Sequence, residues 1–182
     1  ITELCKKHNQ LVPISIEVFA EEPEEMVRQA YDFVEKIGYS NLNIKIPLGW
    51  NELKAIYTLA KNGIAVNCTC LFTEAQCMLA ANAGAKYVSL FFARLKDIGG
   101  DPLTVLRDTK NAFDEFNIST EIISGSIRHF KDVSDAHIAG SHIVTAGYKI
   151  LQSMCQHPQT AKSVEGFLKD FRTWLEPVKI SN

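Results

Sequence analysis

The stretch AGAKYV at residues 83–88 has the same outline as AGSHIV at residues 139–144. In each stretch a helical pattern ends in alanine, a glycine follows that can adopt the left-handed backbone conformation, and an apolar strand pattern begins. The same alternation of strand and helix patterns extends in both directions along the chain. It predicts parallel strands and an α/β fold, and the repeated unit favours a barrel over an open sheet.

Six segments have the apolar and β-branched residues that are typical of strands: residues 14–19, 43–46, 64–71, 86–91, 119–123 and 142–145. Helical patterns cover residues 21–37, 51–62, 73–83, 101–116, 131–139, 148–155 and 163–174. A (β/α)8 TIM barrel has eight strands and usually about 250 residues. We therefore expect residues 1–182 to form a single barrel domain with about six of the eight strands and an extra C-terminal helix. Because the chain starts without methionine, we expect the two missing strands to be N-terminal.

The composition argues against several classes of protein. The net charge is −2 and the pI is about 6.2, so no global basic character favours binding to nucleic acid or to an anionic membrane. No apolar run has the length of a membrane span, and no signal-peptide pattern is visible. Five scattered cysteines suit a reducing compartment, and we expect a cytoplasmic protein. Cys68 and Cys70 are interpreted as buried thiols, and no metal site is predicted.

Lys45 is the residue that indicates chemistry most directly. In the segment NIKIP at residues 43–47, strand alternation places Ile44 and Ile46 on one face and Lys45 on the other. An ammonium group that is withdrawn from water loses its proton more readily, and the neutral amine can attack a carbonyl to form a Schiff base. The alternative is a lysine at a strand edge that extends its charge into water.

Polar residues recur in the same phase near the ends of the other strands, where a barrel carries its active site. Glu17 can hold a water molecule or relay protons to Lys45. Amide and hydroxyl groups can bind substrate hydroxyls, and guanidinium and hydroxyl groups can bind a phosphate. Each residue has a structural alternative, but their shared inward phase indicates a site. The candidates are Lys45 and Glu17 for catalysis, Asn67, Thr69, Ser89 and Phe91 for substrate binding, and Arg94 (in the loop after its strand), Ser126 and Arg128 for phosphate binding.

Six motifs occur together in the order and spacing of a known family. They are NIKIP (43–47), NCTCLF (67–72), AGAKYVS (83–89), RLKDI (94–98), SIR (126–128) and HP (157–158). From about residue 12 to residue 174 the chain resembles the small transaldolase-like proteins, a group that includes transaldolase and fructose-6-phosphate aldolase.

This resemblance implies a (β/α)8 barrel, a Schiff base on Lys45, a sugar-phosphate substrate, and no metal or organic cofactor. It assigns a water-holding carboxylate to Glu17, hydroxyl binding to Asn67 and Thr69, and phosphate binding to Arg94, Ser126 and Arg128. Glutamate at position 17 with phenylalanine at position 91 resembles the transaldolases, whereas glutamine with tyrosine would resemble the aldolase. The resemblance also implies a homo-oligomer, a pentamer or decamer, in which the C-terminal helix lies on a neighbour. Three apolar residues suit such docking, with packing on their own subunit as the alternative: Phe167, Phe171 and Trp174.

The chain also departs from the family. The family's first two strands carry an acid–base aspartate and an Asn-Pro motif, and neither is found here. Leu90 replaces a usual proline and Ala93 a usual glycine. A barrel without two strands leaves open sheet edges, which aggregate or recruit a partner.

Together these features predict a class I transaldolase of the pentose phosphate pathway, which moves a dihydroxyacetone unit between sugar phosphates. Fructose-6-phosphate aldolase is the close alternative. An alternative of another class is a non-catalytic barrel that binds sugar phosphates. A metal-dependent aldolase is less favoured because the sequence shows no inward cluster of histidines.

Overall fold

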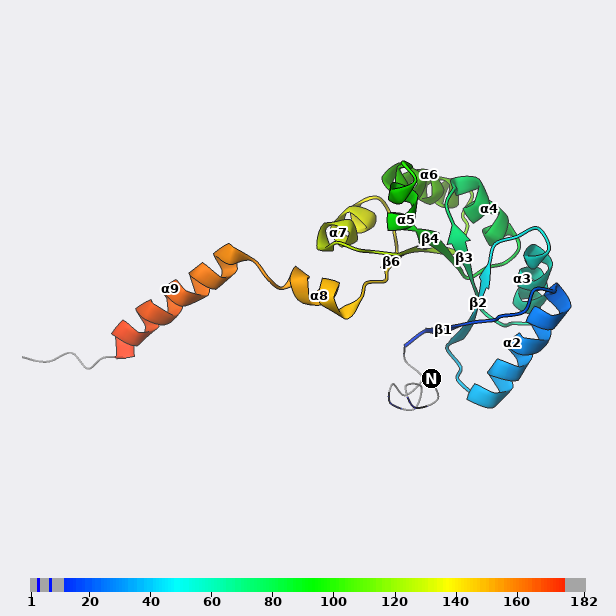
Figure 1. Ribbon diagram of the computed structural model, residues 1–182, viewed down its shortest axis with the longest axis horizontal. Coiled ribbons are helices and arrows are strands. Elements are labelled where there is room, and N and C mark those ends of the chain that lie inside the picture. The colour runs from blue at the N-terminus through cyan, green and yellow to red at the C-terminus, as the bar shows by residue number, and fades with distance from the viewer. Residues whose placement is uncertain (1–2, 4–6, 8–11, 176–182) are drawn as a thin grey trace, which may run out of the picture. The chain divides into compact units, whose positions relative to one another are not determined.

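The computed structural model describes residues 3, 7 and 12–175. Its centre is a sheet of six parallel strands that follow one another in chain order. Figure 1 shows this sheet curling into part of a barrel. The parallel α/β fold and the partial barrel are therefore confirmed. The strands are β1 (Ile14–Glu17), β2 (Leu42–Pro47), β3 (Val66–Leu71), β4 (Tyr87–Phe91), β5 (Glu121–Gly125) and β6 (Ile143–Val144).

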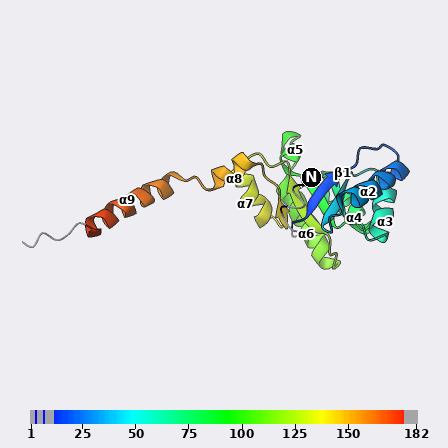
Figure 2. The same cartoon turned by 90° about the horizontal axis from the view of Figure 1, so that it is seen from below.

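Helices connect successive strands and lie along the outer, convex side of the sheet, as the two perpendicular views show (Figures 1 and 2). Helices α4 and α7 each begin with a capping box, formed by Thr73 with Gln76 and by His129 with Asp132. The side chain of Asp101 caps α6. The helices between the strands are α2 (Pro23–Ile37), α3 (Glu52–Lys61), α4 (Glu74–Asn82), α5 (Phe92–Asp97), α6 (Pro102–Glu115) and α7 (Phe130–Ile138).

The two glycines of the repeated stretch confirm the repeat. Gly84 has a φ of +95° and Gly140 a φ of +107°, a conformation that side chains with a Cβ rarely adopt. Each glycine also lies against a neighbouring helix: a Cβ added at Gly84 would lie 2.8 Å from the Cβ of Ala60, and one at Gly140 would lie 2.8 Å from the Cβ of Lys110. The two residues therefore turn the chain from helix into strand and allow close packing at the same step of two βα units.

The core lies between the convex face of the sheet and the helices. Alternate residues of the strands are almost completely excluded from solvent there: Ile44, Ile46, Val66, Cys68, Val88, Leu90 and Ile122. Their helix partners include Ile56 and Leu59 of α3 and Leu106 and Phe113 of α6, which are buried to a similar degree. Burying each large aliphatic side chain is worth about 1.5–3 kcal/mol, so this layer holds the sheet in its curve.

Two predicted features of the elements were wrong. Phe92–Asp97 forms the short helix α5, so Arg94 lies on a helix and not in a loop. The final helix α9 spans Pro158–Leu175 and thus begins five residues before the predicted start at residue 163. At the start of both helices the apolar residues do not repeat with a helical period for long enough to indicate the first turn.

The chain divides into two compact units, residues 1–146 and residues 147–182. The second unit contains α8 (Tyr148–Met154) and α9, and neither helix has a buried residue. Among the described residues, no helix is both long and apolar enough to cross a membrane. The expectation of a single domain stays a prediction.

Candidate active site

The concave face of the sheet encloses a cavity of about 570 Å³. Side chains alternate along each strand, so those that do not face the convex core face this cavity. Six of the nine predicted site residues line this cavity: Lys45, Asn67, Thr69, Ser89, Phe91 and Ser126. Glu17, Arg94 and Arg128 are not among its lining residues, although Glu17 contacts Lys45. Seven of the nine predicted residues therefore lie in or next to the cavity, but their chemical roles stay predictions.

Lys45 and Glu17 form an ion pair across neighbouring strands. The register pairs Glu17 of β1 with Lys45 of β2, and the Lys45 Nζ lies 3.3 Å from the Glu17 Oε2. The two side chains are 28% and 40% exposed, so water still screens their attraction. A pair of this kind contributes about 0–1 kcal/mol to stability. The pair places a carboxylate within reach of the Lys45 amine.

Asn67 is held by hydroxyl groups from two other strands. Its Nδ2 donates to the Ser15 Oγ at 3.1 Å, and the Ser89 Oγ donates to its Oδ1 at 2.7 Å. Asn67 itself is only 5% exposed. The amide lies next to the amine, because the register pairs Lys45 with Asn67. Ser15 also lines the cavity, yet the sequence argument gave it no role.

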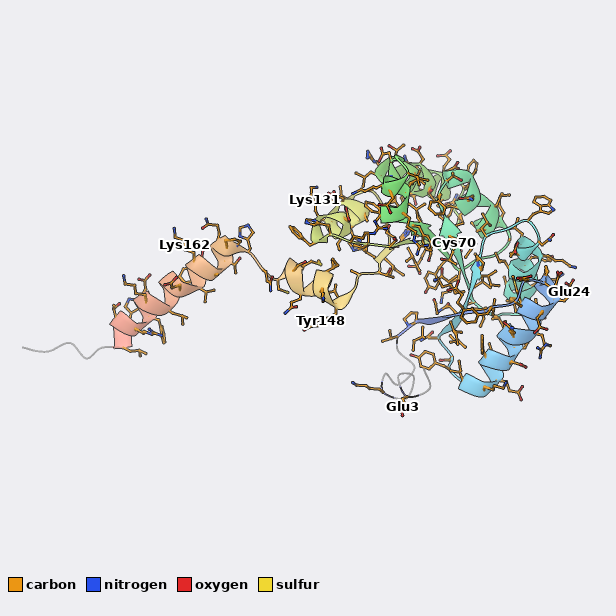
Figure 3. The ribbon with its side chains drawn as sticks, viewed as in Figure 1. Glu3, Glu24, Cys70, Lys131, Tyr148 and Lys162 are labelled. Atoms are coloured by element: carbon orange, nitrogen blue, oxygen red, sulfur yellow. The ribbon has the colours of Figure 1, made fainter. Side chains whose placement is uncertain are left out.

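Thr69 presents a hydroxyl group to the cavity from an irregular part of β3. Its Oγ1 is buried and has no hydrogen-bond partner among the described residues. The next residue, Cys70, which is labelled in Figure 3, has a φ of +62°, and the register with β4 shifts between Cys68 and Leu71. This bulge re-aims the end of the strand, as bulges beside active sites commonly do. A buried hydroxyl without a partner is available to a ligand.

Phe91 and Arg94 lie together at the carboxyl end of β4. The guanidinium carbon of Arg94 is 4.5 Å from the centre of the Phe91 ring, and Phe72 meets the same ring edge to face at 5.8 Å. Arg94 is exposed. Stacking on an aromatic ring orients a guanidinium group without using its hydrogen-bond donors, which stay free for an anion.

Arg128 is oriented in a different way, by two hydrogen bonds to Asp97 at 2.8 and 2.7 Å. These bonds and the negative charge of Asp97 raise the pKa of Arg128 above its ordinary value. Both side chains are about half exposed. The pair joins the end of α5 to the segment after β5, where Ser126 has a φ of +62° and faces the cavity. No local pattern in the sequence predicts this contact between residues 31 positions apart.

Two further cavity residues were not singled out from the sequence. Asn43 is buried two positions before Lys45, and its Oδ1 has no hydrogen-bond partner in the described part of the chain. Tyr87 lies two positions before Ser89. Strand alternation alone would have placed both on the inward face. The described residues contain no group of three or more histidine, cysteine, aspartate or glutamate side chains that could hold a metal ion.

Comparison with known proteins gives a consistent result. A family model described as Transaldolase/Fructose-6-phosphate aldolase matches residues 1–179. A probable transaldolase of Thermoanaerobacter sp. (strain X514) is 44% identical over 172 residues, which cover 93% of this chain and 79% of that protein. A probable transaldolase of Herpetosiphon aurantiacus is 39% identical, with coverage of 94% and 75%. One from Clostridium kluyveri is 43% identical, with coverage of 94% and 80%.

Proposed function

Because this chain belongs to the transaldolase/fructose-6-phosphate aldolase family, we propose that it is a Schiff-base transaldolase of the pentose phosphate pathway, with Lys45 as its nucleophile. The observation that carries the proposal is the position of the Lys45 amine. It lies within the cavity, 3.3 Å from a carboxylate and in register with Asn67. A strand-edge lysine that merely reaches into water needs no such surroundings.

The proposed reaction begins when the neutral amine of Lys45 attacks the ketone of a ketose phosphate. Loss of water gives an iminium. The adjacent carbon–carbon bond then breaks: its electron pair passes to the iminium, and the hydroxyl of the departing carbon gives its proton to a water molecule beside Glu17, which returns a proton when the new bond forms. The departing fragment is an aldose phosphate, and a dihydroxyacetone unit stays on Lys45 as an enamine. The enamine carbon then attacks the aldehyde of an acceptor aldose phosphate. Water finally hydrolyses the new iminium and frees Lys45.

Glu17 is proposed to move protons during formation and hydrolysis of the iminium. Both steps need a proton to pass between the amine, the carbinol oxygen and water. The Glu17 carboxylate is close enough to Lys45 to hold a water molecule beside the reacting carbon. Its partial exposure keeps water available to it.

The remaining candidate residues are proposed to position the substrate. The amide of Asn67 and the unpartnered hydroxyl of Thr69 bind hydroxyl groups of the dihydroxyacetone unit. Ser89 supports Asn67, and Phe91 supplies an apolar wall. We assign phosphate binding to Ser126, which lines the cavity, to Arg94, which stacks on the cavity residue Phe91, and to Arg128 through the donors that Asp97 leaves free.

Fructose-6-phosphate aldolase is the alternative, because the family description covers both activities. Glu17 and Phe91 favour transaldolase by resemblance, and the three relatives described above are named probable transaldolases. The two activities differ in the fate of the three-carbon unit: transaldolase passes it to an aldehyde, and the aldolase releases it into water.

An assay with fructose 6-phosphate, with and without erythrose 4-phosphate, separates them. We expect a seven-carbon ketose phosphate only when erythrose 4-phosphate is present, and little free dihydroxyacetone without it. Release of dihydroxyacetone at the same rate with and without the acceptor would instead identify the aldolase. Binding of the sugar phosphate without either product would identify a non-catalytic barrel.

The apolar face of α9 supports a proposal on assembly. Phe167, Phe171 and Trp174 are 71%, 53% and 79% exposed. By resemblance to the family, we propose that these side chains lie against a neighbouring copy in a homo-oligomer. Light scattering should give several times the chain mass of 20.3 kDa, and replacement of Phe171 and Trp174 by serine should lower that mass.

A further inference from the structure

We propose that Ser15 is a positioning residue of the site, which acts by holding the side-chain amide of Asn67 in the orientation needed for substrate. The inference rests on the proposed function, since it assumes that Asn67 binds a substrate hydroxyl. Ser15 itself has no assigned role. The inference is based on geometry: Ser15 lies two strands away from Asn67, and yet its hydroxyl contacts the Asn67 side chain.

The curl of the sheet explains this contact. Ser15 is on β1 and Asn67 on β3, with β2 between them. In a barrel, inward side chains from alternate strands share one layer, so β1 and β3 meet above the side chains of β2. The Asn67 Nδ2 donates to the Ser15 Oγ at 3.1 Å, whereas the backbone of Ser15 is in register with Asn43. A flat sheet would keep the two side chains apart.

Two hydroxyl groups are needed because the terminal torsion of asparagine is soft. The side-chain amide of asparagine rotates over a broad range unless hydrogen bonds fix its plane. Ser89 donates to the Oδ1 on one side, and Ser15 accepts from the Nδ2 on the other. Either contact alone leaves the amide free to swing about it. Together they fix the plane of the amide and leave one N–H of Nδ2 free to meet a ligand.

Asn67 lines the cavity in which Lys45 lies. Asn67 is the register partner of Lys45, and Ser15 lines the same cavity. The amide therefore lies beside the carbon skeleton that Lys45 would carry as a Schiff base. If the Asn67 amide rotates, a hydroxyl group of the dihydroxyacetone unit loses its hydrogen bond to the amide. The reacting carbon is then held less precisely.

A double-mutant cycle tests the proposal, because a residue that acts only through Asn67 has no effect once the amide is gone. In the intact protein, Ser15→Ala should lower kcat/KM for fructose 6-phosphate about fivefold to tenfold, the size expected for one hydrogen bond. Asn67→Ala should lower it further, and adding Ser15→Ala to that variant should change it less than about twofold. Ser15→Thr keeps the hydroxyl at an exposed position that lines the cavity, so activity should return.

Ser119→Ala is the matched control, since it makes the same chemical change at an exposed serine away from the cavity, and it should leave kcat/KM unchanged. Two results would overturn this inference and leave the proposed function standing. One is that Ser15→Ala lowers kcat/KM by the same factor whether residue 67 is asparagine or alanine. The other is that Ser15→Thr lowers kcat/KM as much as Ser15→Ala does. Wild-type protein that turns over no sugar phosphate would instead refute the proposed function and this inference with it.

Discussion

The two faces of the sheet differ although the same strands build both. On the convex face of β2, Ile44 and Ile46 are 0% exposed and pack beneath the helices. On the concave face of the same strand, Lys45 and Asn43 line a cavity and carry polar groups. One strand therefore contributes to the stability of the fold on one side and to the proposed chemistry on the other. Because the side-chain period is two, a register slip of one residue would exchange the two faces.

This difference predicts that substitutions on the concave face change activity with little effect on stability, and that those on the convex face do the reverse. Among the concave polar side chains, Lys45 and Glu17 are partly hydrated, so their replacement costs little folding energy. Convex side chains are close-packed, so their truncation leaves a cavity. Each substitution below either tests this separation or measures how complete it is.

The largest effect on the concave side, apart from loss of Lys45, is expected for Glu17→Gln. The amide cannot take up a proton as the carboxylate does, so turnover should fall about 10²–10⁴-fold. The free energy of unfolding should change by less than about 1 kcal/mol, because the ion pair with Lys45 is partly exposed. Steady-state kinetics and urea unfolding measure the two quantities. Glu24→Gln serves as the control, because it breaks an exposed ion pair with Lys54 on the outer helices. If turnover fell equally in the two variants, Glu17 would have no specific role in catalysis.

On the convex side, Ile46→Ala should lower the free energy of unfolding by about 2–5 kcal/mol through lost burial and an unfilled cavity. Lys45→Met, one residue earlier and on the other face, should cost less than about 1 kcal/mol. Chemical unfolding of both variants gives the comparison. If Lys45→Met proved the more destabilising, the two faces would not be separate in the way described.

At the edge of the concave face, Arg128→Lys should raise KM for phosphorylated substrates about tenfold, or about 1.4 kcal/mol. Lysine cannot reproduce the paired hydrogen bonds by which Asp97 orients the guanidinium group. An unphosphorylated ketose should show no such change. Arg28→Lys alters an arginine that pairs with Glu25 on the outer face of α2, and its KM values should match those of the wild type. Equal effects on phosphorylated and unphosphorylated ketoses would remove Arg128 from phosphate binding.

The thiols of the convex layer change stability only at alkaline pH. Burial raises the pKa of Cys68 and of Cys77 from 9.0 to about 12. Because both folded-state pKa values lie above the unfolded value, this contribution to stability is complete below pH 9 and is lost as the pH rises toward 12.

Stability measured from pH 9 to pH 12 should therefore fall less steeply when both Cys68 and Cys77 are replaced by alanine. The exposed Cys155 provides the control, since Cys155→Ser should not alter the slope. Alkylation of the native protein at pH 8 should modify Cys155 and spare Cys68 and Cys77. Rapid modification of either buried thiol would show that the convex layer is open to solvent.

Much of the fold followed from local patterns. The alternation of strands and helices, the glycines at 84 and 140, and the inward phase of Lys45 are all features of periodicity or backbone conformation that neighbouring residues determine. Helix α5 escaped prediction because it has only six residues and follows β4 directly, so Phe92 and Leu95 continue an apolar run without a full helical period.

The candidate site was predictable as a set of residues but not as a set of contacts. Ser15 reaches Asn67 only because the sheet curls, and that curl depends on packing along its whole convex face. The bulge at Cys70 could not be predicted, because the residue with the positive φ is a cysteine and not a glycine. Asp97 and Arg128 meet through the placement of α5, the helix that the sequence did not reveal.

Reductive trapping tests whether Lys45 forms a covalent Schiff base. The protein is incubated with fructose 6-phosphate and sodium borohydride, and the modified peptide is identified by mass spectrometry. The account predicts a reduced three-carbon adduct on Lys45 in the wild type and in the control Lys54→Arg, and none in Lys45→Met. An adduct of normal yield in Lys45→Met, or one located on another lysine of the wild type, would contradict it.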